Sequence, residues 1–315
     1  MRGLVVSGSR NVFTIKPLDG GAPSPYLECR IKGKVLKVES DCYNPLAPGD
    51  IVAFEPSGCG QGMILGVEPR TNLFARFNRK KGMTQTLAAN IDQIVCVTSP
   101  AQPPFRPRFI DRVLAQAEAS RLPAMVLLNK SDLTDADCQA NGVESRLADY
   151  RRIGYTVMRT SALSGEGVAA LRSILANRLS VFTGQSGVGK SSLINILLPG
   201  AKRQTGAVNT KHDRGNHTTV LSALLEDASD ERINIIDTPG VRQLSPDGVS
   251  PQDLASYMKE FSAPALHCAF GASCTHVSES GCSVLSAVAA GAIHPDRYES
   301  FTRIRSELQG KGGRT

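Results

Sequence analysis

The fold is decided by one short stretch of sequence, Gly184-Gln185-Ser186-Gly187-Val188-Gly189-Lys190-Ser191. An apolar run at residues 180–183 precedes it and an apolar helical pattern follows it, so a strand enters the turn and a helix leaves it. This spacing is that of a phosphate-binding loop, in which glycines let backbone N–H groups surround phosphates at a helix N-terminus. A chance glycine-rich turn is the alternative, but it would not explain the strand and the helix on either side.

Three polar side chains at the end of this loop have expected roles. Lys190 should reach the β- and γ-phosphates of a nucleotide, and the Ser191 hydroxyl should bind Mg²⁺. Ser192 stands beside them at the start of the helix and belongs to the same expected site. The loop alone does not distinguish ATP from GTP, so the base must be read elsewhere.

The expected base-reading residues are Asn129-Lys130-Ser131-Asp132, which follow the apolar run 124–128. The Asp132 carboxylate can accept two hydrogen bonds from the guanine N1–H and 2-amino group, and adenine offers neither donor. A site built for buried hydrogen bonds rejects a base that cannot make them by roughly 10⁴-fold or more. Asn129 is expected to brace the neighbouring loops, and the Lys130 stem to cover the base. The motif predicts guanine, although a polar loop could carry these residues by chance.

Two further motifs also follow apolar runs. Ser161 and Ala162 come where a backbone N–H would meet the guanine O6. Residues 237–240 have the pattern D-x-x-G, in which Asp237 is expected to hold Mg²⁺ through water and the Gly240 N–H to contact the γ-phosphate. All these motifs stand at the carboxyl ends of predicted strands, where open α/β sheets bind ligands.

A threonine ligand of Mg²⁺ is expected between the phosphate-binding loop and the D-x-x-G motif. Residues 200–219 are rich in Gly, Lys, Arg and Asn, and Thr218 is our choice within them, with Thr219 as the alternative. The residue after D-x-x-G is usually a water-orienting glutamine in Ras-like proteins. Val241 stands in that place here and cannot orient water, so another residue or a partner must do so.

The order of these motifs along the chain is permuted, because the guanine motif precedes the phosphate-binding loop. In residues 87–244 apolar runs alternate with helical patterns, which predicts a doubly wound parallel sheet. Residues 1–86 indicate short strands separated by turns, which together with a basic surface favours a five-stranded OB barrel. Residues 245–315 are mostly helical in pattern. We therefore expect a multidomain α/β chain with these three domains.

The net charge of +7 is concentrated in residues 1–90, which carry 12 Lys/Arg against 7 Asp/Glu. This excess points to a polyanionic partner such as nucleic acid, and a solvated basic face is the alternative. No apolar run is long enough for a membrane helix, and the first residues lack the apolar stretch of a secretory signal. We therefore expect a cytoplasmic protein that does not bind membranes.

Three of the eight cysteines lie close together in the sequence, Cys268, Cys274 and Cys282, with His276 among them. Three cysteines and one histidine are a ligand set of closed, structural zinc sites. We therefore expect one Zn²⁺ per chain, held by these four residues. Buried free thiols are the alternative.

Taken together, the chain resembles the RsgA/YjeQ family of ribosome-assembly GTPases over nearly its whole length. The resemblance rests on the motifs above, on residues 88–95 (AANIDQIV) and on Gly215-Asn216-His217-Thr218-Thr219. It implies an N-terminal OB-fold, a permuted GTPase domain and a C-terminal zinc domain. It also implies action late in maturation of the small ribosomal subunit, which stimulates the hydrolysis of GTP to GDP. His217 matches the family histidine proposed to act where Val241 cannot.

Two positions depart from the family pattern. Val220 stands where the family usually has a third threonine. The gap between Cys268 and Cys274 is one residue longer than usual, which leaves His267 as a possible substitute for Cys268.

The sequence favours a monomeric GTPase switch that binds the small ribosomal subunit and its rRNA, with Lys190, Thr218 and His217 as catalytic residues. GTP and Mg²⁺ are expected to order residues 200–219. The rival function is a nucleotide-regulated RNA-binding chaperone whose hydrolysis is incidental. A P-loop metabolic kinase is disfavoured, because the guanine motif is present and no phosphoacceptor site is evident.

Overall fold

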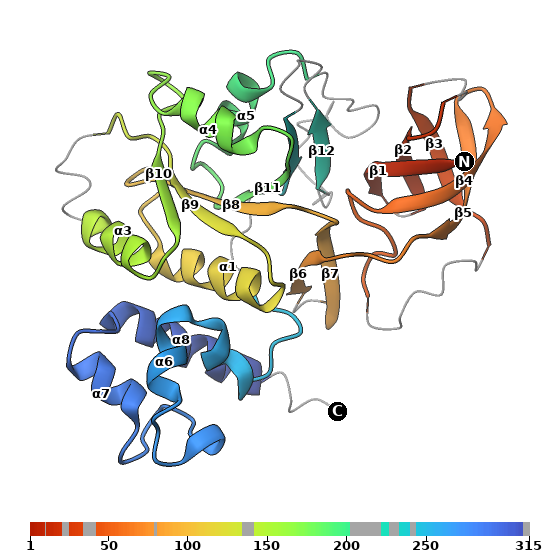
Figure 1. The fold of residues 1–315 in the computed structure, drawn as a ribbon. Coiled ribbons are helices and arrows are strands. Elements are labelled where there is room, and N and C mark those ends of the chain that lie inside the picture. The colour runs from red at the N-terminus through yellow and green to blue at the C-terminus, as the bar shows by residue number, and fades with distance from the viewer. Residues whose placement is uncertain are drawn as a thin grey trace.

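The computed structural model describes residues 1–9, 11–20, 25–33, 42–78, 81–133, 142–201, 222–226, 233–239 and 244–310. Figure 1 shows a barrel on one side of a central sheet, and a group of helices that packs below the sheet's lower helical layer. No helix in the described part of the chain is long and apolar enough to cross a membrane.

The central sheet has six strands in the order β10-β9-β8-β11-β13-β12. Five of them are parallel, and the edge strand β12 is antiparallel to β13. The strands are β8 (Gln93–Thr98), β9 (Ala124–Leu128), β10 (Thr156–Arg159), β11 (Leu179–Gly184), β12 (Ala223–Glu226) and β13 (Asn234–Asp237). The predicted doubly wound sheet is confirmed.

Helices cover both faces of this sheet, as Figure 1 shows. They are α1 (Pro107–Ala119), α3 (Val143–Arg152), α4 (Val168–Leu175) and α5 (Lys190–Leu197). Side chains alternate along a strand, so Cys96 packs in the core with α1 and α3, and Val97 packs in the core with α4 and α5. Both faces of the strands are therefore buried, which is why the sequence shows continuous apolar runs.

The N-terminal barrel is closed, with strand order β1-β2-β3-β5-β4. Its strands are β1 (Arg2–Ser9), β2 (Val12–Pro17), β3 (Leu27–Ile31), β4 (Ile51–Gly58) and β5 (Gln61–Val67). Fully buried apolar side chains such as Val5, Ile15 and Phe54 fill its interior. The predicted five-stranded barrel is confirmed. The sequence pattern indicates strands at residues 12–15, 26–31, 50–54 and 63–67, and the structure adds β1 as the fifth.

A two-stranded hairpin, β6 (Leu73–Asn78) and β7 (Met83–Ala89), lies between the barrel and the sheet. Asn90 lies between the hairpin and β8 and connects the barrel to this part of the chain. Its backbone is in the left-handed region at φ 53°. Its side chain accepts a hydrogen bond from the Thr71 N–H (2.8 Å) and donates one to the Gly49 carbonyl (2.9 Å). The Asn90 side chain therefore links the barrel loop at Gly49 and the linker at Thr71 to the chain that enters the sheet.

The C-terminal part is helical, as predicted. It contains η1 (Asp253–Tyr257), α6 (Lys259–Ala265), η2 (Gly271–Ser273), α7 (Ser283–Ala289) and α8 (Pro295–Gln309). Helices α8 and η1 pack on α1, so the C-terminal part sits on one helical layer of the sheet (Figure 1).

One helix is shorter than its apolar pattern indicated. The pattern of Val168–Leu179 continues to the start of β11, but α4 ends at Leu175. Asn177 adopts a left-handed backbone at φ 56°, which turns the chain out of the helix and into the strand.

Candidate active site and metal centre

The phosphate-binding loop joins β11 to α5, as the sequence predicts. Gly187 and Gly189 have φ values of 88° and 89°, a backbone region that side chains rarely adopt. A Cβ at Gly189 would also overlap the side-chain amide of Asn129. Glycine is therefore needed at this position both for the turn and for the close approach of the guanine motif.

Lys190 is buried at the start of α5, and its ammonium group points into the loop. Its Nζ donates hydrogen bonds to the carbonyls of Gly184 (2.9 Å) and Gln185 (3.1 Å). Burial lowers the pKa of this ammonium group, and the negative charge of Asp237 opposes the shift. Ser191 and Ser192 are exposed on the first turn of the helix. A positive charge and two free hydroxyl-bearing side chains thus stand at one helix N-terminus, where phosphates bind.

Asn129 is fully buried and connects the guanine motif to two other loops. Its Nδ2 donates to the Val188 carbonyl of the phosphate-binding loop at 2.9 Å. Its Oδ1 accepts from the backbone N–H of Ala162 at 3.2 Å. The predicted bracing contacts are thus present in the structure, between segments that lie far apart in the sequence.

The exposed carboxylate of Asp132 is held by Ser161, whose Oγ donates a hydrogen bond to Oδ1. The same Oγ accepts hydrogen bonds from the backbone N–H groups of Leu163 (3.1 Å) and Ser164 (3.0 Å). One hydroxyl therefore both folds the loop after β10 and fixes the orientation of the carboxylate that is expected to read guanine.

The chain between β8 and α1 also reaches this site, although no sequence motif indicates it. The Lys130 ammonium group donates to the backbone carbonyl of Gln102. A Cβ at Gly187 would lie 3.4 Å from Pro103 in the same segment. A backbone carbonyl carries no residue-type signal, so no motif could have revealed this contact.

The D-x-x-G motif begins at the end of β13, next to β11. In the parallel pairing of β13 with β11, Asp237 lies opposite Phe182. The Thr238 hydroxyl donates to the Phe182 carbonyl at 2.9 Å. This places Asp237 beside the strand that leads into the phosphate-binding loop. Gly240, His217, Thr218 and its alternative Thr219 lie outside the described residues, so their expected roles stay predictions.

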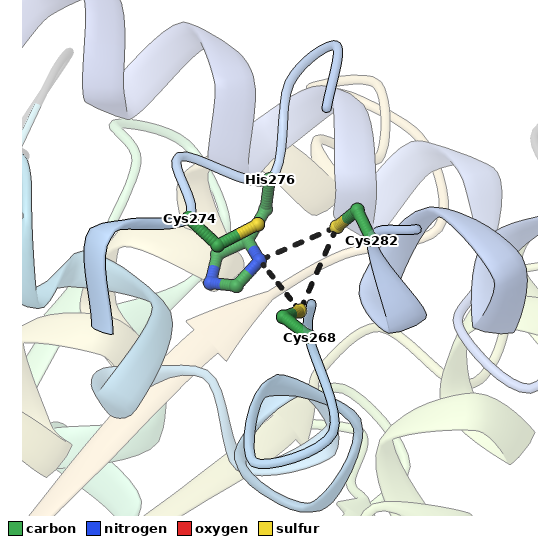
Figure 2. A group of neighbouring side chains, drawn as sticks. All are labelled: Cys268, Cys274, His276 and Cys282. Atoms are coloured by element: carbon green, nitrogen blue, oxygen red, sulfur yellow. Dashed lines mark hydrogen bonds between the residues drawn. The ribbon is translucent and has the colours of Figure 1, made fainter. Parts of the chain in front are cut away.

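The four residues of the cysteine cluster come together in space, with their ligand atoms within 4.8 Å of one another. Figure 2 shows the His276 ring directed at the sulfur atoms. The Cys268 and Cys282 sulfurs are 3.8 Å apart, and they lie 3.5 and 3.4 Å from the His276 Nδ1. Tetrahedral Zn²⁺ with Zn–S near 2.3 Å requires sulfur separations of about 3.8 Å. The donor set therefore fits a tetrahedral metal ion.

Surrounding side chains fix the loop that carries His276. The Glu279 carboxylate accepts hydrogen bonds from the backbone N–H groups of Thr275 (2.7 Å), Val277 (2.9 Å) and Ser278 (3.1 Å). The Tyr298 hydroxyl of α8 donates to the His276 carbonyl at 2.9 Å. Burial lowers the pKa of the His276 imidazole, which favours the neutral ring that binds metal.

The possible substitute for Cys268 does not enter this group. His267 is exposed, while all four cluster residues are buried. Its backbone carbonyl accepts from the Ser283 hydroxyl at 2.7 Å.

These features define a P-loop nucleotide-binding protein of the GTPase class, in which the guanine-reading loops come before the phosphate-binding loop in the chain. Comparison with known proteins agrees with this class. The chain matches the family described as RsgA GTPase over residues 67–246. It therefore belongs to the RsgA GTPase family.

Similar proteins cover nearly the whole chain. It is 36% identical to "Small ribosomal subunit biogenesis GTPase RsgA" of Chlorobaculum parvum, covering 98% of both chains. It is 37% identical to the protein of the same name from Borreliella afzelii, covering 97% of this chain and 95% of the relative. Among solved structures, YjeQ from Thermotoga maritima has 31% identity and a TM-score of 0.73, with 98% of each chain covered. YloQ, described as a circularly permuted GTPase, has 25% identity and a TM-score of 0.69, covering 100% of this chain and 96% of its own.

Proposed function

We propose that this protein is a GTPase that acts in the late maturation of the small ribosomal subunit, hydrolysing GTP to GDP and phosphate at the site described above. One observation carries the nucleotide part of the proposal: Asn129 joins the guanine motif to the phosphate-binding loop at Val188. The part that concerns the ribosome is supported by relatives named for small ribosomal subunit biogenesis, which match over nearly their full length.

The chain's own residues have distinct tasks in this reaction. Lys190 and the loop N–H groups bind the β- and γ-phosphates, and Asp132 selects guanine. Ser191, Thr218 and Asp237 would hold Mg²⁺, which neutralises phosphate charge when bound. Because Val241 has no polar group, we assign the positioning of the attacking water to His217.

The partner is the small subunit and its rRNA, bound in part by the basic barrel domain at residues 1–86. The GTPase domain spans residues 87–244, and residues 245–315 form a domain with one structural Zn²⁺ held by the cysteine cluster. We further propose a cytoplasmic monomer. The charge excess of residues 1–90 supports RNA contact, and its binding should weaken steeply with salt because counterions are released.

GTP turnover with and without purified small ribosomal subunits tests this function, with large subunits as the matched control. We expect slow intrinsic turnover that small subunits raise strongly. His217→Ala should lower the stimulated single-turnover rate on the order of 10²-fold, the scale of a lost positioning or acid–base group, with little change in nucleotide affinity. If subunits bind but leave turnover near zero, the protein is an RNA-binding chaperone instead.

A further inference from the structure

Three residues of the guanine motif, Asn129, Ser131 and Asp132, contact the chain that follows β10, and Ser131 has no role in the site so far. Ser131 occupies the variable position of N-K-x-D, and its Oγ donates a hydrogen bond of 2.8 Å to the Glu166 carboxylate. Its backbone N–H donates to the Thr160 carbonyl at 3.0 Å. Both bonds reach the chain that follows β10, the segment expected to meet the guanine O6.

We propose that Ser131 and Glu166 form a positioning pair that holds the loop 161–167 against the guanine motif and thereby sets recognition of the guanine O6. The inference rests on the proposed binding of guanine nucleotides. It assigns a specificity role to two residues that do not touch the base themselves.

The backbone places Glu166 for this contact. It stands between Gly165 and Gly167, whose φ values are 83° and 69°. A Cβ at Gly167 would overlap the Arg159 carbonyl, so the close turn requires glycine. The Glu166 carbonyl also accepts from the Ser161 N–H at 3.0 Å. Glu166 therefore closes the loop with its backbone and ties the closed loop to Ser131 with its side chain.

Asn129 holds the Ala162 N–H and Ser161 folds the loop, but the tip of the loop is exposed to solvent. Leu163, Ser164 and Gly165 are exposed, and Leu163 leaves 85% of its surface open. The loop therefore depends on a few polar contacts, of which the bond to Ser131 is the farthest from Asp132 along the loop. Losing it should move the backbone N–H groups near Ala162 while the Ser161–Asp132 bond keeps the carboxylate in place.

Three nucleotides distinguish recognition of the guanine O6 by the loop 161–167 from recognition of the N1–H and 2-amino group by Asp132. GDP has both the 6-oxo and the 2-amino group, IDP keeps the 6-oxo group and N1–H, and 2-aminopurine riboside diphosphate keeps only the 2-amino group. Ser131→Ala should weaken GDP and IDP binding by the same factor, about threefold to tenfold for an exposed hydrogen bond to a carboxylate. The GDP/IDP ratio and the affinity for the 2-aminopurine nucleotide should stay within about twofold of wild type.

A double-mutant cycle tests the pair itself. Glu166→Ala should reproduce the Ser131→Ala pattern, and the double variant should be no weaker than either single variant. Ser131→Thr, which keeps the hydroxyl, should recover most of the affinity. Ser173→Ala is the matched control, because the hydroxyl of this exposed residue donates to the Ala169 carbonyl of its own helix.

The measurement is equilibrium binding of the three nucleotides to the full-length protein. Unchanged GDP affinity in Ser131→Ala, an equal loss for all three nucleotides, or additive single effects would each overturn the pair's role in O6 recognition. A wild-type protein that binds ADP as well as GDP would instead overturn the proposed guanine site, so the two failures are distinguishable.

Discussion

Replacing Arg297 by methionine should destabilise the protein strongly, because this side chain is a buried charge between two parts of the molecule. Arg297 is fully buried on α8. It donates to Asp111 of α1 at 2.9 Å and to both oxygens of Glu260 of α6 at 2.5 and 2.9 Å. Burial alone would lower the pKa of the guanidinium, but the charges of Asp111 and Glu260 raise it well above its ordinary value. The side chain is therefore always charged.

The size of the effect follows from what the methionine would leave behind. Asp111 would keep hydrogen bonds from the hydroxyls of Tyr150 (2.7 Å) and Ser300 (2.5 Å). Glu260 would lose both guanidinium bonds while its side chain is only 5% exposed. Removing one partner of a buried ion pair costs about 3–5 kcal/mol. We expect a loss in that range, because Glu260 is left buried without its cation.

Urea denaturation followed by circular dichroism measures this loss, since the chain has no tryptophan to report by fluorescence. Arg303→Met is the matched control on the same helix. Arg303 is 54% exposed and pairs with Glu299 at 2.6 Å, so its loss should cost less than about 1 kcal/mol. A loss below about 1 kcal/mol in Arg297→Met, or an equal loss in both variants, would refute the reasoning.

Three further outcomes are expected. Asp132→Asn should lose GDP and gain XDP in competition binding, because the 2-oxo group of xanthine needs a donor; retained GDP preference would contradict the assignment. Cys274→Ser should lower zinc content below the roughly one ion per chain expected for wild type by elemental analysis, and full zinc occupancy would show that Cys274 is not a ligand. Asn90→Ala should loosen the barrel, so limited proteolysis between the barrel and the sheet should accelerate while nucleotide affinity is unchanged.

The sequence predicted the parts of the site that depend on residue type at strand ends. Asn129, Asp132 and Lys190 were identifiable because each follows an apolar strand with a fixed spacing. The sequence could not predict contacts between distant residues that belong to no motif. Asp111 and Arg297 are separated by 186 positions, and only the packing of α8 on α1 brings them together. Charged residues in helices usually indicate a solvated face, so no pattern marked this pair as buried.

The strand β1 lacks a clear sequence signal for a related reason. Its sequence begins Arg2-Gly3 and contains a second glycine at position 8, and glycine is unfavourable in strands on propensity alone. The barrel explains both glycines, because a Cβ at Gly3 would overlap Ile15 and one at Gly8 would overlap Phe13. Close packing inside the barrel therefore overrides local propensity, and only the tertiary structure shows it.

The permuted order has a structural consequence at the point where the chain leaves the sheet after the D-x-x-G motif. After β13, the Thr238 hydroxyl donates to the Phe182 carbonyl of β11. Farther along the chain, Leu244 is fully buried in the core beside α1. Just beyond, Asp247 accepts from the Thr84 hydroxyl of the hairpin (2.8 Å), and its N–H donates to Gln116 of α1 (2.7 Å). An unpermuted chain would continue from this point into the next strand of its own sheet. Here it runs instead along the hairpin and α1 into the C-terminal helices, so the residues that follow the D-x-x-G motif contact the hairpin and α1 before they enter the C-terminal part.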